Sequence, residues 1–381
     1  MSCMMEKNMM NKKILLALAI IIIIAVIITL EESKPEQSFA ERQEIARDTA
    51  QNTVDATNDT ALVSADTSRI LAKEEKYPKA VELVEPGFVN TEPFMLKDHI
   101  GKDIIMIDFW TYSCINCQRT LPYITAWHEK YANKGLLIVG IHTPEFAFEE
   151  KKENVQRAMQ KFSVTYPVVQ DNERKTWFAY QNRYWPHKYL IDIDGFIVYD
   201  HIGEGNYEET EKKIQELLEE RNTVLGLDMV VDTTISAPDI ITPEYEKIKT
   251  PELYFGYGFS RGQLANGVWS PEKTVTYTSP INIVEWNKFY LHGDWKNNVD
   301  NMDLVGVDGR VFLRYIAKNV NIVAGADSPV NVRVFLDGKN TRNITVQAHE
   351  LYSVVEDDKY RERLLELQVE QGTKLYTFTF G

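Results

Sequence analysis

Hydrophobic positions in residues 80–224 follow two periods, which together predict strands alternating with helices. Residues 104–110 and 136–141 are continuous apolar runs rich in β-branched side chains, as expected of strands buried on both faces. Residues 117–131 instead place apolar side chains three and four positions apart, which predicts a helix with one buried face. A second amphipathic helix is predicted over 149–161.

The next segment has the pattern of a hairpin followed by a helix. Asp194 and Gly195 form a two-residue turn signal between apolar runs at 188–193 and 196–200. A helix rich in Glu and Lys is predicted over 207–221. Antiparallel strands that follow a strand–helix–strand–helix unit predict an α/β layer with a mixed sheet flanked by helices.

Beyond residue 225 the pattern is typical of an all-β domain. Short β-rich runs lie at 274–278, 311–315, 330–335 and 374–380, with Asp-Gly turns at 308–309 and 337–338. A short helix is expected in the acidic stretch at 356–367. Regularly spaced short strands predict a sandwich or jelly roll of roughly 150 residues.

The N-terminal residues carry a membrane signal. Residues 14–30 form a 17-residue run without charge, near the lower limit of about 17–25 residues for a spanning helix. Lysines precede the run and glutamates follow it, so we expect the N-terminus in the cytoplasm and the bulk of the chain outside. The alternative is a cleaved signal peptide, but the run is longer than a usual h-region and no A-x-A site follows directly.

These patterns divide the chain into four parts, and its charge excludes one class of partner. We expect a cytoplasmic tip and transmembrane anchor over 1–30, a polar tether over 31–79, the α/β domain over 80–224 and the β-sandwich over 225–381. The formal net charge of −14 at pH 7 argues against a nucleic-acid partner, because phosphate binding needs a basic surface.

Two of the three cysteines, Cys114 and Cys117, stand together as Cys-Ile-Asn-Cys at a predicted strand-to-helix junction. A helix N-terminus presents unpaired N–H groups and partial positive charge, which favour the thiolate form of Cys114 as a nucleophile. Cys117 lies one turn deeper, where it can attack the resulting mixed disulfide. This chemistry is thiol–disulfide exchange, which requires no cofactor.

Other interpretations of the pair are weaker. Zinc needs four ligands, and the sequence has no second Cys/His pair at suitable spacing, so no metal is predicted. A structural disulfide in so short a loop adds little loop-closure stability. Thiol peroxidase chemistry is a closer alternative, because Thr111 precedes Cys114 by three residues as in peroxiredoxins, although Ile107 replaces the proline of that pattern.

Two residues near the pair have predicted roles of their own. Asp108 lies in the apolar strand before Cys114, where a desolvated carboxyl could exchange protons with Cys117. Trp185-Pro186 precedes the hairpin, and a cis peptide there would present backbone polar groups to an extended substrate.

Several motifs give the chain a family resemblance. They are FVNTEPF at 88–94, DFWTYSCINC at 108–117, HTPEFAF at 142–148, YWP at 184–186, GEGNY at 203–207, PELYFGY at 251–257 and TFTFG at 377–381. Residues 81–222 resemble a thioredoxin-fold domain of the TlpA/ResA type. The whole pattern is most similar to the extracytoplasmic half of DipZ-type proteins, in which the C-terminal domain resembles a carbohydrate-binding module.

The resemblance implies roles for five residues of this chain. Cys114 matches the exposed nucleophile and Cys117 the resolving thiol, Asp108 the buried acid and Pro186 the cis-proline. Glu145 falls where related redoxins carry an acidic residue near the cysteines. The implied substrates are client proteins that carry thiols or disulfides.

The chain departs from the family in two ways. Tyr112 and Ser113 precede the pair, and Ile115 and Asn116 separate it, so the Trp and Pro of the thioredoxin motif are missing. Because the potential depends on such neighbours, thioredoxin-like reducing power does not follow. DipZ-type proteins carry a multi-span electron-transfer region, whereas this chain has one predicted span, so we expect a separate membrane electron-transfer protein as partner.

A different class of function rests on the aromatic side chains of the β-rich half. A surface module could bind a glycan or a protein there while the redoxin domain is vestigial. The aromatics that could form a stacking platform are Tyr254, Tyr257, Trp269, Trp286 and Trp295, although in a β-sandwich such residues more often fill the core.

Overall fold

The computed structural model describes the backbone of residues 59–240, 242–280 and 285–381, and side chains from residue 67 onward. The membrane helix predicted at 14–30 and Cys3 lie outside these residues. Among the helices in the described part of the chain, none combines the length and apolar character that a membrane crossing requires.

Helix α3 (Asp59–Glu74) occupies much of the described part of the segment that the sequence predicts to be a polar tether. The last turns of the helix carry Arg69 and Lys73. The Arg69 guanidinium lies 2.8 Å from the Asp194 carboxylate, and Lys73 Nζ lies 2.7 Å from Asp192 and also pairs with Glu220. The polar composition suggested a tether, but these ion pairs to the hairpin turn hold the end of the segment as an ordered helix.

Within the described residues, the α/β domain is built on a six-stranded sheet in the order β1-β4-β3-β2-β5-β6. The strands are β1 (Gly87–Phe88), β2 (Ile104–Trp110), β3 (Leu136–His142), β4 (Val168–Gln170), β5 (His187–Ile191) and β6 (Ile197–Ile202). Strands β2, β3 and β4 are parallel, whereas β1, β5 and β6 are antiparallel to their neighbours. The mixed sheet predicted from the hydrophobic pattern is therefore present.

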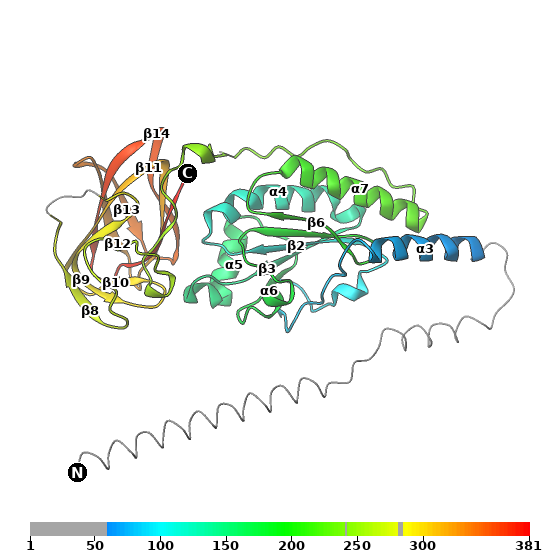
Figure 1. Cartoon of the computed structure of the whole chain (residues 1–381), viewed down its shortest axis with the longest axis horizontal. Helices are drawn as coiled ribbons and strands as arrows, with labels where there is room; N and C mark the ends of the chain where they lie inside the picture. Colours follow the sequence, from blue (N-terminus) through cyan, green and yellow to red (C-terminus); the bar gives the residue numbers. More distant parts are fainter. Residues whose placement is uncertain (1–58, 241, 281–284) are drawn as a thin grey trace, which may run out of the picture. The chain divides into compact units, whose positions relative to one another are not determined.

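Helices cover both faces of this sheet. They are α4 (Ile115–Tyr131), α5 (Lys152–Lys161), α6 (Lys175–Ala179) and α7 (Tyr207–Leu225), with short 3-10 turns at Leu96–Asp98, Ala132–Lys134 and Ala147–Glu150. Figure 1 shows α4 and α7 on one side of the sheet and α6 on the other. Alternation along β2 sends Met106 and Trp110 into the core under α4, while Ile105 and Phe109 join the core under α6.

The C-terminal half is an all-β domain, as predicted, but its strands do not separate into two sheets. Its strands are β7 (Leu253–Tyr254), β8 (Thr274–Tyr277), β9 (Phe289–Asn297), β10 (Met302–Leu304), β11 (Asp308–Gly325), β12 (Val330–Leu336), β13 (Lys339–Val346), β14 (Glu350–Glu370) and β15 (Lys374–Phe380), with 3-10 turns at Tyr245–Lys247 and Tyr257–Phe259. Among these strands, β9 pairs with both β10 and β11, which closes the ring β9-β11-β15-β10 into a barrel.

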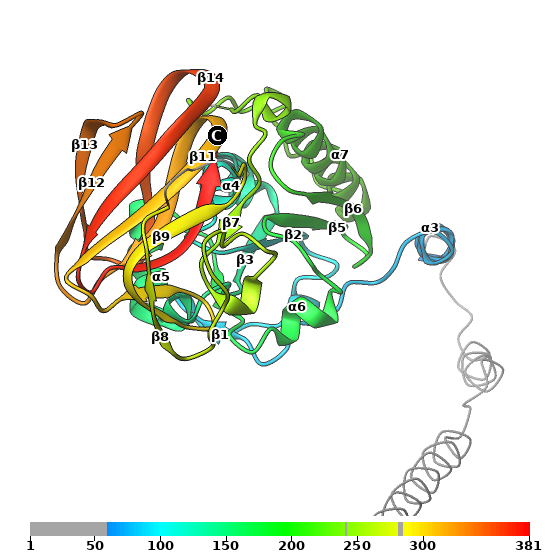
Figure 2. The same ribbon diagram turned by 60° about the vertical axis from the view of Figure 1, so that its left-hand side comes forward.

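The long strands explain why the sandwich expected from short runs becomes a closed sheet. Strands β11 and β14 lie side by side along their length (Figure 2) and pair antiparallel from Asp308 to Ala324. Register shifts near Ala317 and Val320 interrupt this ladder. Such irregularities bend a strand, so β11 can pair with β9 at one end and with β15 at the other.

The short helix expected at 356–367 is wrong, because these residues belong to strand β14. The charged composition suggested a helix, but Leu365, Leu367 and Val369 alternate into the core as strand residues do. These buried side chains and the ladder to β11 outweigh the local preference.

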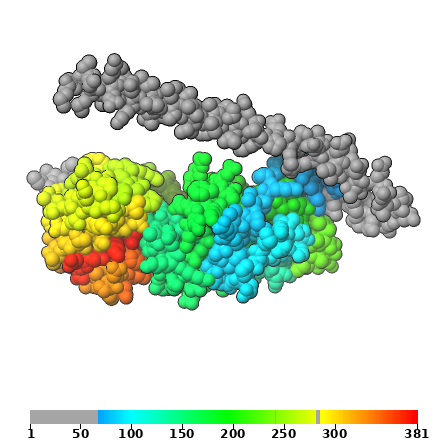
Figure 3. Space-filling model, turned by 90° about the horizontal axis from the view of Figure 1, so that it is seen from below, coloured from blue at the N-terminus to red at the C-terminus, as the bar shows by residue number. Residues whose placement is uncertain are grey.

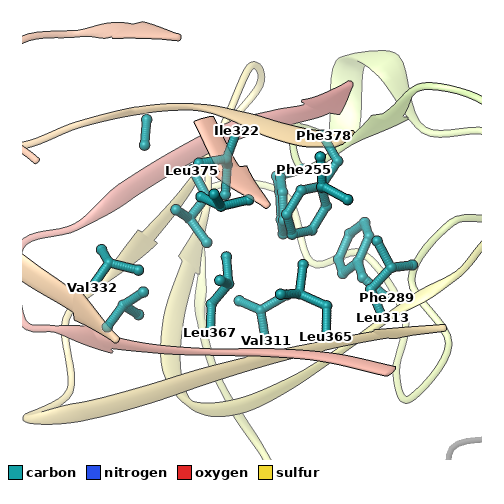
Figure 4. Close-up of a cluster of buried hydrophobic side chains, with 14 of the residues drawn as sticks. Phe255, Phe289, Val311, Leu313, Ile322, Val332, Leu365, Leu367, Leu375 and Phe378 are labelled. Carbon is teal, nitrogen blue, oxygen red and sulfur yellow. The ribbon is translucent and has the colours of Figure 1, made fainter. Parts of the chain in front are cut away.

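Alternating side chains fill the core of the β domain. Figure 4 shows residues such as Phe255, Phe289 and Phe378 pointing toward one another between the strands. Trp295 is fully buried in this core and Tyr254 is also buried. A platform of all five aromatic residues is therefore wrong, because at least these two present no open ring face to a ligand.

The two domains share a set of aromatic contacts, here called the interdomain aromatic cluster. It consists of Phe146, Phe148, Tyr254, Phe259 and Tyr376. Phe148 and Tyr376 meet with ring centroids 4.6 Å apart, and Tyr254 stacks on Phe259 at 5.1 Å. In the space-filling view the α/β domain runs from cyan to green and the β domain from yellow to red (Figure 3). Because members of the cluster are buried together, the domains share one apolar core at this point.

Candidate active site

Cys114 is the N-cap residue of helix α4, with an extended backbone at φ −73° and ψ 120°. Strand β2 ends at Trp110, and three residues connect it to Cys114. The Cys117 backbone N–H donates to Cys114 Sγ at 3.4 Å, and both cysteines are free thiols. The helix start expected from the sequence is therefore present, with its first amide groups facing the sulfur of Cys114.

The two sulfurs differ in exposure. Cys114 is half-buried, whereas Cys117 has 1% of its surface exposed and lies in the core with Met106 and Trp110. Burial raises the pKa of the Cys117 thiol well above its ordinary value, and the neighbouring Cys114 raises it further. Cys117 therefore keeps its proton until a nearby base removes it.

Asp108 lies in strand β2 on the same face as Met106 and Trp110, which contact Cys117 in the core. Its side chain is 1% exposed. Burial raises the pKa of this carboxyl to about 6, and the positive charge of Lys188 partly opposes the shift. The Asp108 charge in turn contributes to the raised pKa of Cys117, so the two groups share an electrostatic environment.

Lys188 is a residue of this environment that the sequence analysis missed. It stands opposite Asp108 in the ladder between β2 and β5 and is fully buried. Its ammonium donates to the Gly203 carbonyl at 3.0 Å, and burial lowers its pKa. The available signal was a single lysine inside the apolar run of a predicted strand, since lysine is almost never fully buried without a partner.

The peptide bond between Trp185 and Pro186 is cis, as predicted. The Trp185 indole N–H donates to the Thr143 carbonyl at 3.0 Å, and its ring contacts Trp177 with centroids 4.3 Å apart. These contacts fix the loop that leads into β5.

A cavity of about 260 Å³ opens at Cys114. From the α/β domain it is lined by Cys114, Ile115, Asn116, Arg119, Glu145 and Trp185. From the β domain it is lined by Tyr245, Ile248, Thr250, Glu252, Tyr254, Thr379 and Phe380. The structure thus brings Cys114 and Glu145 to one cavity, while Cys117 and Asp108 lie buried behind it and Pro186 follows the lining residue Trp185.

Glu145 occupies the loop after β3 and is partly buried. Its Oε1 lies 2.8 Å from the Tyr254 hydroxyl of the β domain. Burial raises the pKa of Glu145 well above its usual range, and the charges of Glu252 and Glu149 add to the shift. The sequence predicts Tyr254 only as a member of an aromatic stacking platform and gives no sign of Glu252. No local pattern relates residues more than 100 positions apart.

Glu149 is a second buried acid that the sequence analysis missed. Its carboxylate accepts hydrogen bonds from the Ser113 hydroxyl at 2.7 Å and from the Glu145 N–H at 2.7 Å. It also accepts from the Phe146 N–H at 3.0 Å. Glu149 therefore ties the turn that carries Cys114 to the loop that carries Glu145.

Two family comparisons match the two halves of the chain. Residues 80–200 match the AhpC/TSA family, and residues 250–381 match a family described as "Thioredoxin like C-terminal domain". The α/β domain is thus similar to the AhpC/TSA family, and the β domain is similar to the C-terminal domain that the second description names.

The chain is also similar to individual proteins over parts of its length. The protein DipZ of Mycobacterium tuberculosis is 35% identical over 298 residues, which are 77% of this chain and 41% of that protein. The thiol-disulfide oxidoreductase ResA of Bacillus cereus is 29% identical over 136 residues, or 35% of this chain and 75% of that protein. A solved thiol-disulfide isomerase from Corynebacterium glutamicum is 20% identical, with a TM-score of 0.35, and covers 38% of this chain and 97% of its own.

These relatives confirm the predicted resemblance to DipZ and ResA. The chain spans about two fifths of the length of the DipZ proteins that it matches.

Proposed function

We propose that this chain exchanges disulfides with client proteins through attack by Cys114 and resolution by Cys117. The observation that supports this activity is the pairing of a half-exposed and a buried thiol at the start of α4. Cys114 opens onto a cavity, whereas Cys117 sits one turn deeper with a raised pKa. This asymmetry is what a two-step exchange needs, because one sulfur meets the client and the other waits in the core.

In the first step the Cys114 thiolate attacks one sulfur of a client disulfide. A bond forms between the two sulfurs, the client disulfide breaks, and the departing client sulfur takes the electron pair and then a proton. The Cys117 N–H and the other free amides at the start of α4 stabilise the negative charge on Cys114 before attack.

In the second step Cys117 resolves the mixed disulfide. The Asp108 carboxylate accepts the Cys117 proton, the new thiolate attacks Cys114, and the client leaves as a thiolate that is then protonated. A pKa of about 6 leaves Asp108 ionised at neutral pH, so it is ready to act as the base. The Lys188 charge supports that ionised form. The same steps in reverse introduce a disulfide into a client.

The cavity limits how a client can reach Cys114. Its volume of about 260 Å³ is the space of fewer than ten waters at roughly 30 Å³ each. We therefore expect a cysteine with one or two neighbouring residues to enter it, rather than a folded surface. Trp185 lines the cavity, so we expect an extended client segment to pair with the backbone of the loop that carries Trp185 and Pro186.

We further propose that the chain works outside the cytoplasm, anchored by the predicted helix at 14–30. A separate membrane electron-transfer protein would then supply or remove the electrons. The division expected from the sequence, with an anchor over 1–30, a tether over 31–79 and domains over 80–224 and 225–381, is part of this proposal. The uncharged run at 14–30, with lysines before it and glutamates after it, supports the anchor.

Trapping of clients tests the proposed exchange. Cys117→Ser is expected to accumulate mixed disulfides with client proteins, because the first step proceeds and resolution cannot. Cys114→Ser is expected to trap none, since the exposed nucleophile is missing. The products are separated on non-reducing gels and identified by mass spectrometry. Retention of exchange activity by both variants, with no trapped client, would refute the mechanism.

The reduction potential of the pair assigns the direction of electron flow. Equilibration of the protein in thiol buffers, followed by alkylation, measures it. A potential near about −270 mV would make the protein a reductase that needs an electron donor. A potential of roughly −120 to −180 mV would make it an oxidant or isomerase.

A further inference from the structure

The hydrogen bonds of Tyr254 carry an inference about the proton of the reaction. Tyr254 Oη lies 2.8 Å from Glu145 Oε1 and 2.8 Å from Glu252 Oε2. A tyrosine hydroxyl has one hydrogen, so it can donate to only one of the two carboxyl groups. The second contact is a hydrogen bond only if the other carboxyl carries a proton and donates it to the tyrosine oxygen. The three groups together therefore hold one extra proton.

We propose that Tyr254 and Glu252 of the β domain form a proton relay with Glu145, which gives a proton to the sulfur that leaves during exchange at Cys114. This inference rests on the proposed function. Glu145 is the group that meets the reacting sulfur, and Tyr254 and Glu252 are positioning residues that act through it.

The two hydrogen bonds of Tyr254 link the exposed Glu252 to Glu145. Glu252 is exposed at the rim, Tyr254 is 5% exposed, and Glu145 is partly buried. All three line the same cavity as Cys114. A proton that Glu145 gives up can therefore be replaced from solvent through Glu252 and the Tyr254 hydroxyl, without a change in the position of any side chain.

The electrostatics of the surrounding groups favour the state in which these three side chains hold the extra proton. Loss of hydration raises the pKa of Glu145. It also raises the pKa of Glu252, although much of the Glu252 side chain is exposed. The negative charge of Glu149 acts in the same direction on Glu145. Arg174 opposes the shift at Glu145, and Arg261 opposes it at Glu252.

The cation on the opposite wall of the cavity already has a partner. Arg119 Nη1 lies 3.2 Å from the Glu204 carboxylate, and Tyr245 contributes a further hydrogen bond to that carboxylate. Arg119 is therefore largely neutralised by Glu204. The protonated carboxyl of the relay is the acidic group that faces both Cys114 and solvent.

The step balances in atoms and electrons. The Cys114 thiolate forms a bond to one client sulfur, and the bond between the two client sulfurs breaks. The departing sulfur takes the electron pair from that bond and the proton from Glu145, which becomes a carboxylate. A proton from solvent then passes through Glu252 and Tyr254 to the Glu145 carboxylate, which is protonated again. In the opposite direction of exchange, the same groups accept the proton.

Two small neutral disulfides distinguish proton delivery from a structural role. The departing sulfur of bis(hydroxyethyl) disulfide is an aliphatic thiolate, which leaves slowly unless it is protonated. Dipyridyl disulfide releases a stabilised aromatic thiolate that needs no proton at sulfur. The reduced full chain is mixed with each probe, and the second-order rate constant is measured at pH 7.

Tyr254→Phe and Glu252→Gln are expected to slow the reaction with the aliphatic probe about tenfold, less than the roughly 10²-fold of a lost general acid, because Glu145 itself remains. The reaction with the aromatic probe should change by less than about twofold, because it needs no acid. Tyr257→Phe and Glu272→Gln remove a similar hydrogen-bonded pair of the β domain, 3.1 Å apart, that does not line the cavity. These controls should leave both rates unchanged.

Two outcomes would overturn the relay in distinguishable ways. Equal slowing of both probes would show that Tyr254 and Glu252 only shape the cavity. A wild-type chain that reacts with neither probe would refute the exchange activity itself, and the relay with it.

Discussion

At the scale of single residues, Asp108 shows a conflict between stability and chemistry. A carboxyl that is 1% exposed loses its hydration, and Lys188 compensates only in part. The pKa therefore rises from 3.8 to about 6. An acid whose pKa is higher in the folded than in the unfolded protein destabilises the fold as pH rises above the unfolded value, and fully so above the folded value. Asp108 thus costs stability at neutral pH, where its carboxylate is needed as a base.

The first prediction concerns Asp108→Asn. At pH 7 the variant should be more stable than the wild type by roughly 3 kcal/mol, the equivalent of a pKa shift of about two units. The difference should shrink as pH falls through 6 and vanish below about 4, where the wild-type carboxyl is protonated in both states. Urea unfolding of the full chain, followed by tryptophan fluorescence, measures this at each pH.

The same variant should lose activity while it gains stability. Without the carboxylate, Cys117 lacks its base, so resolution should slow by about 10²-fold, within the range of general base catalysis. Asp98→Asn removes an exposed carboxyl of the same domain and should change neither property. Lys188→Met should shift the acid limb of the rate profile to higher pH. Equal stability of Asp108→Asn and wild type at pH 7 would contradict the burial argument.

The placement of site residues was predictable where the information is local. Cys114, Cys117 and Asp108 lie within ten positions, and the strand-to-helix pattern places them together. The cis peptide at Pro186 was likewise predicted from its place before the hairpin. Lys188 and Tyr254 were missed because each acts on a residue from a distant part of the chain.

At the scale of elements, the site depends on how two loops are held against the start of α4. Glu149 provides the connection, with its carboxylate bonded to Ser113 on one side and to the Glu145 and Phe146 amides on the other. Because Glu149 is fully buried, water cannot replace these bonds if the carboxylate is removed.

The second prediction follows from these bonds. Glu149→Ala should lower the free energy of unfolding by about 2–4 kcal/mol, because several buried donors lose their acceptor. The Cys114 turn should also become less fixed, so alkylation of Cys114 should change in rate. Glu150→Ala, at the exposed neighbouring position, should leave stability within about 0.5 kcal/mol of wild type. Equal unfolding midpoints for the two variants would show that Glu149 is not the connection.

Element types followed the hydrophobic period where burial and local preference agree. Strand β2 and strand β3 are apolar throughout, and the predicted and observed bounds nearly coincide. At 356–367 the two disagree, since acidic residues suggest a helix while Leu365 and Leu367 pack as strand residues in the core of the β domain. Tertiary packing decides in such segments, and it is not visible in a local window.

At the scale of the whole molecule, the site belongs to both domains. The β domain lines one wall of the cavity at Cys114 and contributes Tyr254 to Glu145. The interdomain aromatic cluster holds this wall in place, with Tyr376 only 4% exposed between Phe148 and Phe146. The sequence predicts two domains but not their contact, because neither domain's pattern distinguishes core side chains from those that a second domain covers.

The last prediction tests this contact with Tyr376→Ala. Loss of the ring removes aromatic packing on Phe146 and Phe148, and a loss of about 2 kcal/mol of contact energy raises the undocked fraction roughly thirtyfold. Amide hydrogen exchange at residues 144–150 should accelerate accordingly, while exchange at 104–110 stays slow because β2 is buried within its own domain. Phe178→Ala, which removes an exposed ring from α6, should alter neither segment. Exchange at 144–150 that matches the wild type would mean that the cluster does not hold the wall, and that the cavity at Cys114 depends on the covalent connection between the domains.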